Sequence, residues 1–274
     1  MEFLSFKKPL TPSLRHTSLL KLKLTRTVLP SKIKTFNLKR KAGRNHCGSI
    51  TVFRKGGGHK RRYRLISSNS TLLSGVVESI EYDPYRSSNV ARIYFSPTKS
   101  HFYILAPQGL KRGHYIKSQT KSQQFSYKIG HLHILKNIPL GVFLHNISFS
   151  KTNTAAAKSA GCSVQLISKT QDYCRLRMPS GEHRIFGSNA QASIGVISNL
   201  LHKQQSLGKA GRSRWLNRRP IVRGVAMNPI DHPHGGKTAG GCPPVTPWGK
   251  LTKNQSTKKS PTNTLIVKSR KSKK

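Results

Sequence analysis

The sequence predicts a mainly β protein built from small barrels, and three observations support this fold class. Apolar residues alternate with others between Val90 and Phe95, a period of two that suits a strand packed on one face. Many similar short runs lie at close spacing, which is typical of small barrels. Turn signals rich in Pro, Gly, Asp or Ser separate them, at 83–84, 107–109 and 179–182. Seven further runs are expected to be strands: Ile50–Arg54, Gly75–Tyr82, Phe102–Ala106, Val142–Ile147, Val164–Ser168, Tyr173–Met178 and His183–Gly187.

Helices are expected to be scarce, and the best candidates are short turns near Asn189–Gly195 or Leu200–Leu207. In the expected strand Tyr173–Met178, the even-numbered residues would face the core. The odd-numbered residues Tyr173, Arg175 and Arg177 would then face outward. One aromatic ring and two cations on one surface suit base stacking and phosphate contact.

The charge of the chain points to a polyanionic partner. Its 274 residues contain 50 Lys and Arg against 7 Asp and Glu, a formal charge of +43. A compact chain with this charge would repel itself without a counter-polyanion. Nucleic acid fits, because each phosphate contact by Lys or Arg releases condensed counterions. A membrane partner is disfavoured, since the sequence has no apolar run of about 18 residues and no long basic amphipathic helix.

Length allows one or two domains, and the aliphatic residues concentrate between about Ser49 and Ile197. The two ends are basic arms that are too polar and too repulsive to fold alone. Residues 1–34 are rich in Ser, Thr, Lys and Arg. This is the composition of an organellar transit peptide and equally of an RNA-binding tail, so cleavage of this stretch stays open.

A glycine-rich segment at 54–64 predicts RNA contacts. It lacks the G-x-x-x-x-G-K-[ST] spacing of a nucleotide-hydrolysing loop. Its glycines allow the backbone to approach a phosphate closely, and its cations supply charge. The alternative is a flexible loop with solvated charges. The candidate contacts are Arg54, His59, Lys60, Arg61, Arg62 and Arg64.

The segment 212–249 combines arginines, two tryptophans, a histidine pair and repeated Gly and Pro with one acid, Asp231. It has too few aliphatic residues to bury and too many helix and strand breakers to fold by itself. An external polyanion is therefore expected to order it. The candidate contacts are Arg212, Arg214, Trp215, Arg218, Arg219, Arg223, His234 and Trp248.

Metal, cofactor and enzyme chemistry are not expected. The pair His232 and His234 has no third metal ligand at a recognisable spacing. Catalysis by this pair would need converging acids, which the chain almost lacks. The four cysteines are scattered without a C-x₂-C pair and are expected to be reduced thiols. They are Cys47, Cys162, Cys174 and Cys242.

Several long motifs, in this order, resemble the universal ribosomal large-subunit protein two family, and the resemblance runs from about residue 7 to the end. They are AGRNHCGSITVFRKGGGHKRRYR at 42–64, VVESIEYDPYRSSNVARI at 76–93, YILAPQGLKRG at 103–113, NIPLGVFLHNI at 137–147, KSAGCSVQLI at 158–167, LRMPSGEHR at 176–184 and LGKAGRSRWLNRRPIVRGVAMNPIDHPHGG at 207–236.

The resemblance implies an OB-fold barrel followed by an SH3-like barrel, with extended basic N- and C-terminal segments. On this chain these would be a basic extension at 1–43, an OB-fold RNA-binding domain at 44–120, an SH3-like barrel at 125–198 and an rRNA-threading segment at 199–274. The implied function is a structural constituent of the large ribosomal subunit near the peptidyl-transferase centre and the subunit interface. Its partners would be large-subunit rRNA, neighbouring ribosomal proteins and the small subunit, with no small-molecule substrate. The alternative is a general nucleic-acid-packaging protein.

The resemblance also implies roles for individual residues. Family RNA contacts map onto Arg86 in YDPYR and onto Lys158 in KSAG, where an arginine is often found. Lysine keeps the charge but loses the bidentate fork. The histidine that the family links to peptidyl transfer maps onto His232, for which a structural role as an RNA contact is favoured over general acid–base catalysis. Arg44 and Lys209, within the matched motifs, complete the candidate RNA contacts.

Two departures from the family pattern stand out. Residues 237–239 follow Gly236 without the usual Gly-Glu-Gly, so this loop is shorter and loses an acid. Ser49 replaces a family arginine.

The Pro-Trp-Gly motif at 247–249 and the sequence of the histidine segment indicate a bacterial or organellar ribosome. A mitochondrion is the first expectation, with a plastid or a bacterium as alternatives.

Overall fold

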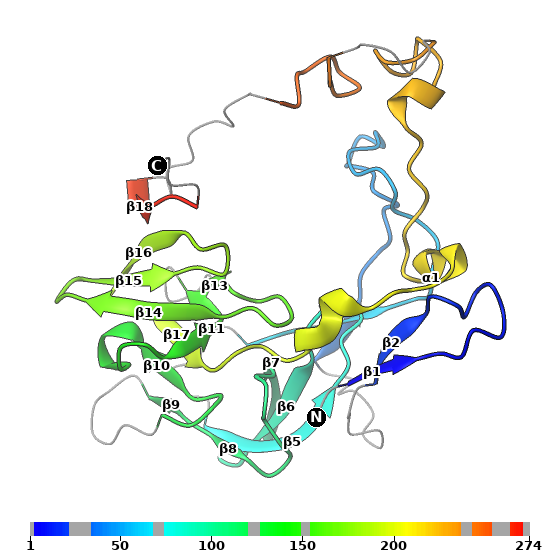
Figure 1. The fold of residues 1–274 in the computed structure, drawn as a ribbon. Helices are drawn as coiled ribbons and strands as arrows, with labels where there is room; N and C mark the ends of the chain where they lie inside the picture. The colour runs from blue at the N-terminus through cyan, green and yellow to red at the C-terminus, as the bar shows by residue number, and fades with distance from the viewer. Residues whose placement is uncertain are drawn as a thin grey trace. The chain divides into compact units, whose positions relative to one another are not determined.

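The computed structural model describes residues 3–21, 34–67, 74–119, 127–148, 154–236, 243–253 and 264–270 (Figure 1). The shortened loop after Gly236, Cys242 and part of the N-terminal stretch lie outside these ranges. The strands are β1 Phe3–Phe6, β2 Ser18–Lys21, β3 Thr35–Asn37, β4 Arg62–Arg64, β5 Gly75–Glu81, β6 Val90–Phe95, β7 Ser100–Leu105, β8 Tyr115–Ile116, β9 Ser118–Gln119, β10 Leu132–Ile134, β11 Phe143–His145, β12 Ile147–Ser148, β13 Thr154–Ala156, β14 Val164–Lys169, β15 Tyr173–Arg177, β16 His183–Gly187, β17 Gln191–Ile194 and β18 Ile266–Lys268. Helical elements are 3-10 turns η1 Leu135–Asn137, η2 Leu200–Gln204 and η3 Gly224–Ala226, and the α-helix α1 Ala210–Trp215. The mainly β prediction is confirmed.

The first barrel contains a four-stranded antiparallel sheet in the order β7-β6-β5-β8. Its hydrophobic core includes Val77, Ala91 and Ile93. The sequence predicted that the strand from Val90 would pack on one face only, whereas residues 90–93 are all buried. The reason is that a cluster of polar side chains, which includes Arg92, covers the second face.

The second barrel is built on an eight-stranded sheet in the order β18-β16-β15-β14-β11-β17-β10-β9. Strands β16, β15 and β14 are neighbouring antiparallel strands that lie toward the β18 edge of this sheet (Figure 1). In β15 the predicted alternation is confirmed: Cys174 and Leu176 are buried, and Tyr173 and Arg177 are exposed. Burial raises the pKa of the Cys174 thiol, so this side chain packs as a small hydrophobe.

Three predicted elements differ from the structure. Residues 50–54 form a bend and a turn rather than a strand, because Arg54 adopts a φ of 70° and the surrounding apolar side chains stay exposed. Residues 191–194 form β17 rather than a helical turn, because hydrogen bonds to β10 and β11 on either side override local signals. The run 142–147 is interrupted at Asn146, which has a φ of 50°. The 3-10 helix at 200–204 agrees with the second helical candidate.

The basic N-terminal arm contains a hairpin, β1 with β2, that sequence patterning did not reveal. Ser18 exchanges backbone hydrogen bonds with Ser206 at 3.0 and 3.1 Å. Thr17 is buried, and a Cβ on Gly208 would lie 1.9 Å from its hydroxyl oxygen. The arm is too polar to form a core of its own, but main-chain pairing with residues near η2 orders residues 3–21 within the barrel-containing unit.

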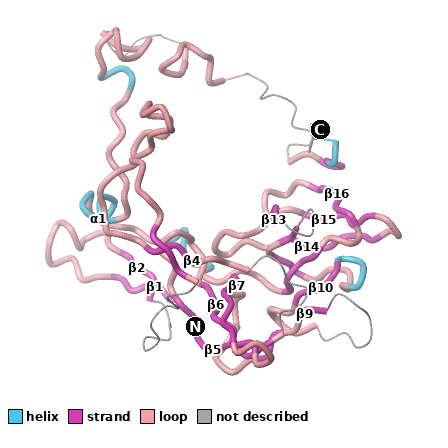
Figure 2. The backbone as a smooth tube through the Cα atoms, turned by 180° about the vertical axis from the view of Figure 1, so that it is seen from behind, coloured by secondary structure: helices cyan, strands magenta, loops and turns pink. Residues whose placement is uncertain are grey.

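The chain divides into two compact units. The first contains both barrels and comprises Met1–Leu38, Lys60–Lys209 and Leu265–Lys274. The second joins Lys39–His59 to Ala210–Thr264. Figure 2 shows the described part of this second unit as loop with short helices. Bridges between Lys55 and Arg218 and between Arg44 and Ile50 replace regular sheet there.

We expect the barrels to lose stability in mild acid through His145. Burial lowers the pKa of this histidine from 6.5 to about 4, although a hydrogen bond to the Gly195 carbonyl opposes the shift. In the unfolded chain His145 therefore becomes protonated below about pH 6.5, whereas in the folded chain it stays neutral until the pH falls to about 4. Stability is complete above pH 6.5 and falls as the pH drops through this window, by about 2 kcal/mol between pH 7 and 5.

Urea denaturation followed by far-ultraviolet circular dichroism measures this loss. His145→Asn is the matched control, because its amide can donate to Gly195 without titrating. An equal pH dependence in the wild type and in this variant would assign the acid sensitivity to other groups.

Candidate nucleic-acid interface

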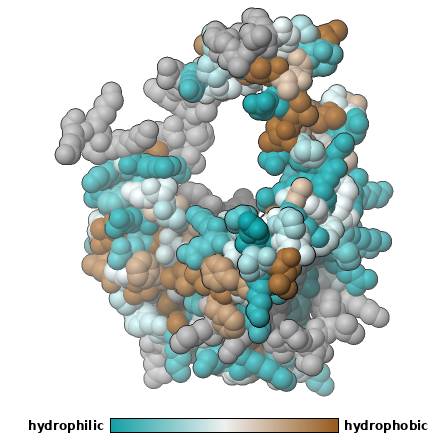
Figure 3. All heavy atoms as spheres, turned by 45° about the vertical axis from the view of Figure 1, so that its right-hand side comes forward, coloured by the Kyte–Doolittle hydropathy of each residue, from teal (hydrophilic) through white to brown (hydrophobic). Residues whose placement is uncertain are grey.

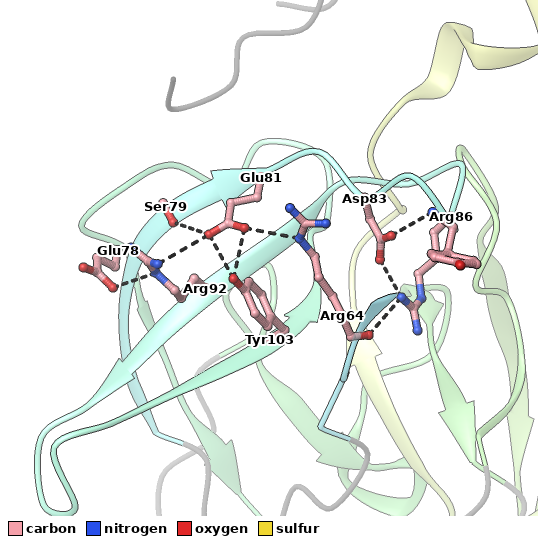
Figure 4. Close-up of polar contacts among 9 residues, drawn as sticks. Arg64, Glu78, Ser79, Glu81, Asp83, Arg86, Arg92 and Tyr103 are labelled. Carbon is pink, nitrogen blue, oxygen red and sulfur yellow. Dashed lines mark hydrogen bonds and ion pairs between the residues drawn. The ribbon is translucent and has the colours of Figure 1, made fainter. Parts of the chain in front are cut away.

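The acids of the first barrel are occupied by internal contacts (Figure 4). Glu81 is buried and accepts hydrogen bonds from the Tyr103 hydroxyl at 3.0 Å and from Arg64 Nε at 3.3 Å. Ser79 donates to its second oxygen at 3.3 Å. Arg92 lies 3.7 Å from Glu81 and 2.9 Å from Glu78. These carboxylates are therefore engaged by side chains of the barrel itself.

Arg86, which the resemblance predicts to contact RNA, is held at the edge of this network by several contacts. Its guanidinium donates to Asp83 and to the Arg64 carbonyl at 3.2 Å (Figure 4). The same group donates to the Tyr63 hydroxyl at 2.9 Å. It also lies over the Tyr63 ring, 4.9 Å from the centroid. Asp83 is fully buried and accepts from the Tyr85 amide, which fixes the turn. The sequence thus builds a preorganised cation from a short acid-aromatic turn.

A second arginine belongs to the same cluster, in which two neighbouring tyrosine rings each carry one guanidinium group. Arg61 lies 4.6 Å from the centroid of Tyr85, and Tyr85 meets Tyr63 edge to face at 5.5 Å. Arg61 also donates to the Pro84 carbonyl at 3.2 Å. Stacked guanidinium groups of this kind present fixed donors and flat faces, which suit phosphates and bases.

Lys158 from the second barrel borders the same site. A pocket of about 170 Å³ is lined by Arg86, Lys158 and Tyr63, together with residues of both barrels. Desolvation lowers the pKa of Lys158, and the charge of Arg86 lowers it further. Arg86 and Lys158 thus place two cations in the lining of one pocket, an arrangement that suits an anion such as a phosphate.

The second unit is held together by backbone pairing between the glycine-rich loop and the segment after α1. Arg219 donates its amide to the Arg54 carbonyl at 3.0 Å, and His59 donates to the Trp215 carbonyl at 3.3 Å. Arg40 caps this loop by donating to the carbonyls of residues 57, 58 and 59. These contacts arrange cations from two distant parts of the chain along one paired backbone.

Gly58 allows the two segments to approach. Its φ is +76°, and a Cβ there would lie 2.7 Å from both the Asn217 nitrogen and the Trp215 carbonyl oxygen. Only glycine meets both demands without displacing the backbone. At Gly58 the glycine-rich sequence therefore allows two segments of the same chain to pack closely, in addition to any close approach to phosphate.

His232 and His234 form hydrogen bonds with the nearby backbone of the second unit. His232 is 8% exposed, and its Nδ1 accepts the His234 amide at 3.0 Å, so Nε2 carries the proton in the neutral ring. The two rings are 4.6 Å apart. Nε2 of His234 lies 2.8 Å from the Pro243 carbonyl and 3.2 Å from the Val245 amide. The pair thus organises the local backbone.

The structure places the candidate contacts in both units with different exposures. Arg61, Arg86, Arg212 and His234 are partly buried, and Arg64 and His232 are buried. The others are exposed: Arg44, Arg54, His59, Lys60, Arg62, Lys158, Lys209, Arg214, Trp215, Arg218, Arg219, Arg223 and Trp248. Sequence reasoning missed Arg40, Tyr63 and Tyr85. Alternation of aromatic and basic residues around 61–63 and 85–86 was the signal that could have identified the two tyrosines.

The described residues contain no group of three or more His, Cys, Asp or Glu able to hold a metal ion. Among the same residues, no helix is both long and apolar enough to cross a membrane.

Comparison with known proteins identifies the family. Residues 33–118 match Ribosomal Proteins L2, RNA binding N-terminal domain, and residues 128–261 match Ribosomal Proteins L2, C-terminal domain. The chain is 47% identical over 262 residues to large ribosomal subunit protein uL2 of Wolbachia pipientis subsp. Culex pipiens (strain wPip), covering 93% of this chain and 94% of the relative. It is 46% identical over 273 residues to large ribosomal subunit protein uL2m of Reclinomonas americana, covering 95% of both chains.

A further relative is large ribosomal subunit protein uL2 of Rickettsia bellii (strain OSU 85-389), 45% identical over 274 residues and covering 96% of this chain and 97% of the relative. Both matched domains and the near-complete coverage agree with an OB-fold barrel followed by an SH3-like barrel. Proteins of this family are structural constituents of ribosomes. The chain belongs to the ribosomal protein L2 family.

Proposed function

We propose that this chain, a structural rRNA-binding protein of the large ribosomal subunit, binds rRNA through two preorganised surfaces. One surface is the Arg61, Arg86 and Lys158 cluster of the barrels. The other is the cationic second unit, with six Lys and Arg in 39–59, ten in 210–264, and one acid, Asp231. The observation that carries the proposal is the rigid Arg86, whose guanidinium is fixed by Asp83 and Tyr63 beside a second cation.

The candidate contacts divide into direct and positioning roles. Exposed and partly buried cations with their neighbouring rings contact phosphates and bases. Arg64 acts as a positioning residue, because its Nε is bonded to Glu81 and its carbonyl holds Arg86. His232 acts as a positioning residue through its bond to the His234 amide, and the same bond makes Nε2 the N–H group of the neutral ring, which could donate to RNA.

The place of the chain within the ribosome extends this proposal. We place the second unit near the peptidyl-transferase centre and the small-subunit contact, where an acid-poor backbone can run between phosphates. The domain limits 44–120 and 125–198 remain part of the proposal. The two hydrophobic cores lie within these limits. Residues 44–59, however, belong to the same compact unit as residues 210–264.

A mitochondrial ribosome is the proposed location, with plastid and bacterial ribosomes as alternatives. Similarity to the Reclinomonas protein, whose name uL2m is of the mitochondrial type, supports an organelle. Similarity to the Rickettsia and Wolbachia proteins is compatible with an organellar or a bacterial ribosome. The pairing of Ser18 with Ser206 supports retention of residues 3–21 in the assembled protein.

We expect His232→Gln to leave peptide transfer nearly unchanged in large subunits that contain it. Glutamine can still accept the His234 amide, and a scaffold role requires no proton transfer. The rate of transfer to puromycin per assembled large subunit should stay within about threefold of the wild type. Loss of a general acid or base typically costs about 10²- to 10⁴-fold. A loss of that size, in particles with normal protein content, would contradict the scaffold role.

A further inference from the structure

The second unit contains a pocket of about 560 Å³ that the contacts described above do not fill. Its walls come from residues between 42 and 55, from residues between 219 and 232, and from Pro247. The apolar part of the lining includes Ile50, Val52, Phe53, Ile221 and Val222. Arg44, Arg54, Lys55 and Arg219 supply the charge of the lining, and no acid contributes to it.

The apolar walls of the pocket are open to solvent. Ile50 is 44% exposed, Phe53 is 55% exposed and Ile221 is 61% exposed. Figure 3 shows hydrophobic residues in brown on the surface of this unit beside hydrophilic residues in teal. Exposed apolar area rimmed by polar groups marks a binding site, because burying it releases water at a favourable free energy.

The lining selects the chemistry of its occupant. Apolar side chains favour a flat, weakly polar body, while four cations without an acid require negative charge close to that body. A volume of about 560 Å³ lies within the range, roughly 300–1,000 Å³, that holds small organic groups. A nucleotide within an RNA strand combines the two features, since its base is flat and its flanking phosphates are anionic.

We propose that this pocket receives an unstacked, unpaired nucleobase of rRNA, with the flanking phosphates on Arg44, Arg54, Lys55 and Arg219. The inference rests on the proposed function, because it presumes that the second unit binds rRNA. Phe53 offers the ring for stacking, and the Trp248 ring lies 6.2 Å from it at an angle of 41°. A base within a continuous helix could not enter, so the occupant comes from a loop, a bulge or a strand end.

His232 gives the pocket a fixed polar wall. Its ring lines the pocket, and its bond to the His234 amide leaves Nε2 as the N–H group. A Cβ on Gly224 would lie 2.6 Å from Nδ1, so glycine at this position allows the ring to sit where it does. The buried histidine can thus donate a hydrogen bond to a carbonyl or ring nitrogen of the base.

The test uses the full-length chain bound to protein-free large-subunit rRNA over a series of salt concentrations. Phe53→Ala should weaken binding by roughly 5- to 100-fold, the usual cost of losing one base–aromatic stack. The slope of log K against log salt should stay unchanged, because the phosphate contacts remain. Phe143→Ala is the matched control: Phe143 is 51% exposed but lies on β11, outside this pocket. Its affinity should equal that of the wild type.

Ultraviolet cross-linking of the same complexes identifies the occupant. Mass spectrometry should find a nucleotide adduct on Phe53 or Met227, another pocket residue, and the adduct on residue 53 should vanish in Phe53→Ala. Normal rRNA binding by Phe53→Ala would overturn the inference and leave the proposed function intact. So would adducts confined to residues outside the pocket. Failure of the wild-type chain to bind the rRNA would instead overturn the proposed function.

Discussion

Glu81→Gln is expected to reduce the free energy of unfolding of this protein by roughly 3–5 kcal/mol, the usual cost of removing one partner from a buried ion pair. Glu81 is 5% exposed and accepts from Tyr103, Arg64 and Ser79, with Arg92 at 3.7 Å. The substitution keeps the shape of the side chain but leaves buried guanidinium charge uncompensated. A loss of this size is a large share of the roughly 5–15 kcal/mol that stabilises ordinary domains.

The measurement is urea denaturation of the full-length chain at neutral pH. Glu182→Gln is the matched control, because Glu182 pairs with Arg184 at a partly exposed turn, where side-chain exposures are 19% and 25%. Partly exposed pairs contribute about 0–1 kcal/mol. Comparable losses in the two variants would mean that the Glu81 network does not stabilise the barrel as described. Because Arg64 positions Arg86, we also expect Glu81→Gln to weaken rRNA binding.

Neutralising four cations of the second unit is expected to produce the largest loss of rRNA affinity. The variant is Arg54→Gln, Lys55→Gln, Arg218→Gln and Arg219→Gln, which removes two cations from each of the paired segments. Each lost phosphate contact lowers the salt slope by about one, so the slope should fall by about three to four. Affinity for large-subunit rRNA should fall by roughly 10²-fold or more near physiological salt.

A control with the same change in net charge separates specific contacts from general attraction. Lys7, Lys8, Arg15 and Lys21 of the N-terminal hairpin are exposed and lie outside the proposed contacts. Replacing these four by glutamine should change the salt slope by less than about one. Equal losses in the two variants would favour a general nucleic-acid-packaging protein, for which only total charge matters.

The sequence predicts the strands whose side chains alternate along the chain. Cys174 and Leu176 could be assigned to the core because a period of two is visible within five residues. The strand β17 could not be predicted, since its partners β10 and β11 lie about 60 and 50 residues away along the chain. Residues 50–54 have apolar content like that of a strand, but in the described structure their only β-pairing is an isolated bridge from Ile50 to Arg44, and their apolar side chains stay exposed.

The candidate RNA contacts also divide into features that the local sequence predicts and features that depend on distant parts of the chain. Composition predicts that the cations around 54–64 and 212–223 meet RNA, since charge needs no knowledge of the fold. It cannot predict that Arg64 turns inward to Glu81, because that contact joins residues on β4 and β5. His232 is similar: spacing suggested a histidine pair, while its burial and its bond to the His234 amide depend on the path of the backbone.

The central claim is that this chain is an rRNA-bound constituent of the large ribosomal subunit, and sedimentation of ribosomes from its own source tests it most directly. Lysate is separated on sucrose gradients at moderate salt, and the protein is followed by mass spectrometry or antibody. We predict that it peaks with the large subunit and stays there at a salt concentration that removes loosely bound basic proteins. Its absence from the large-subunit peak under these conditions would contradict the account.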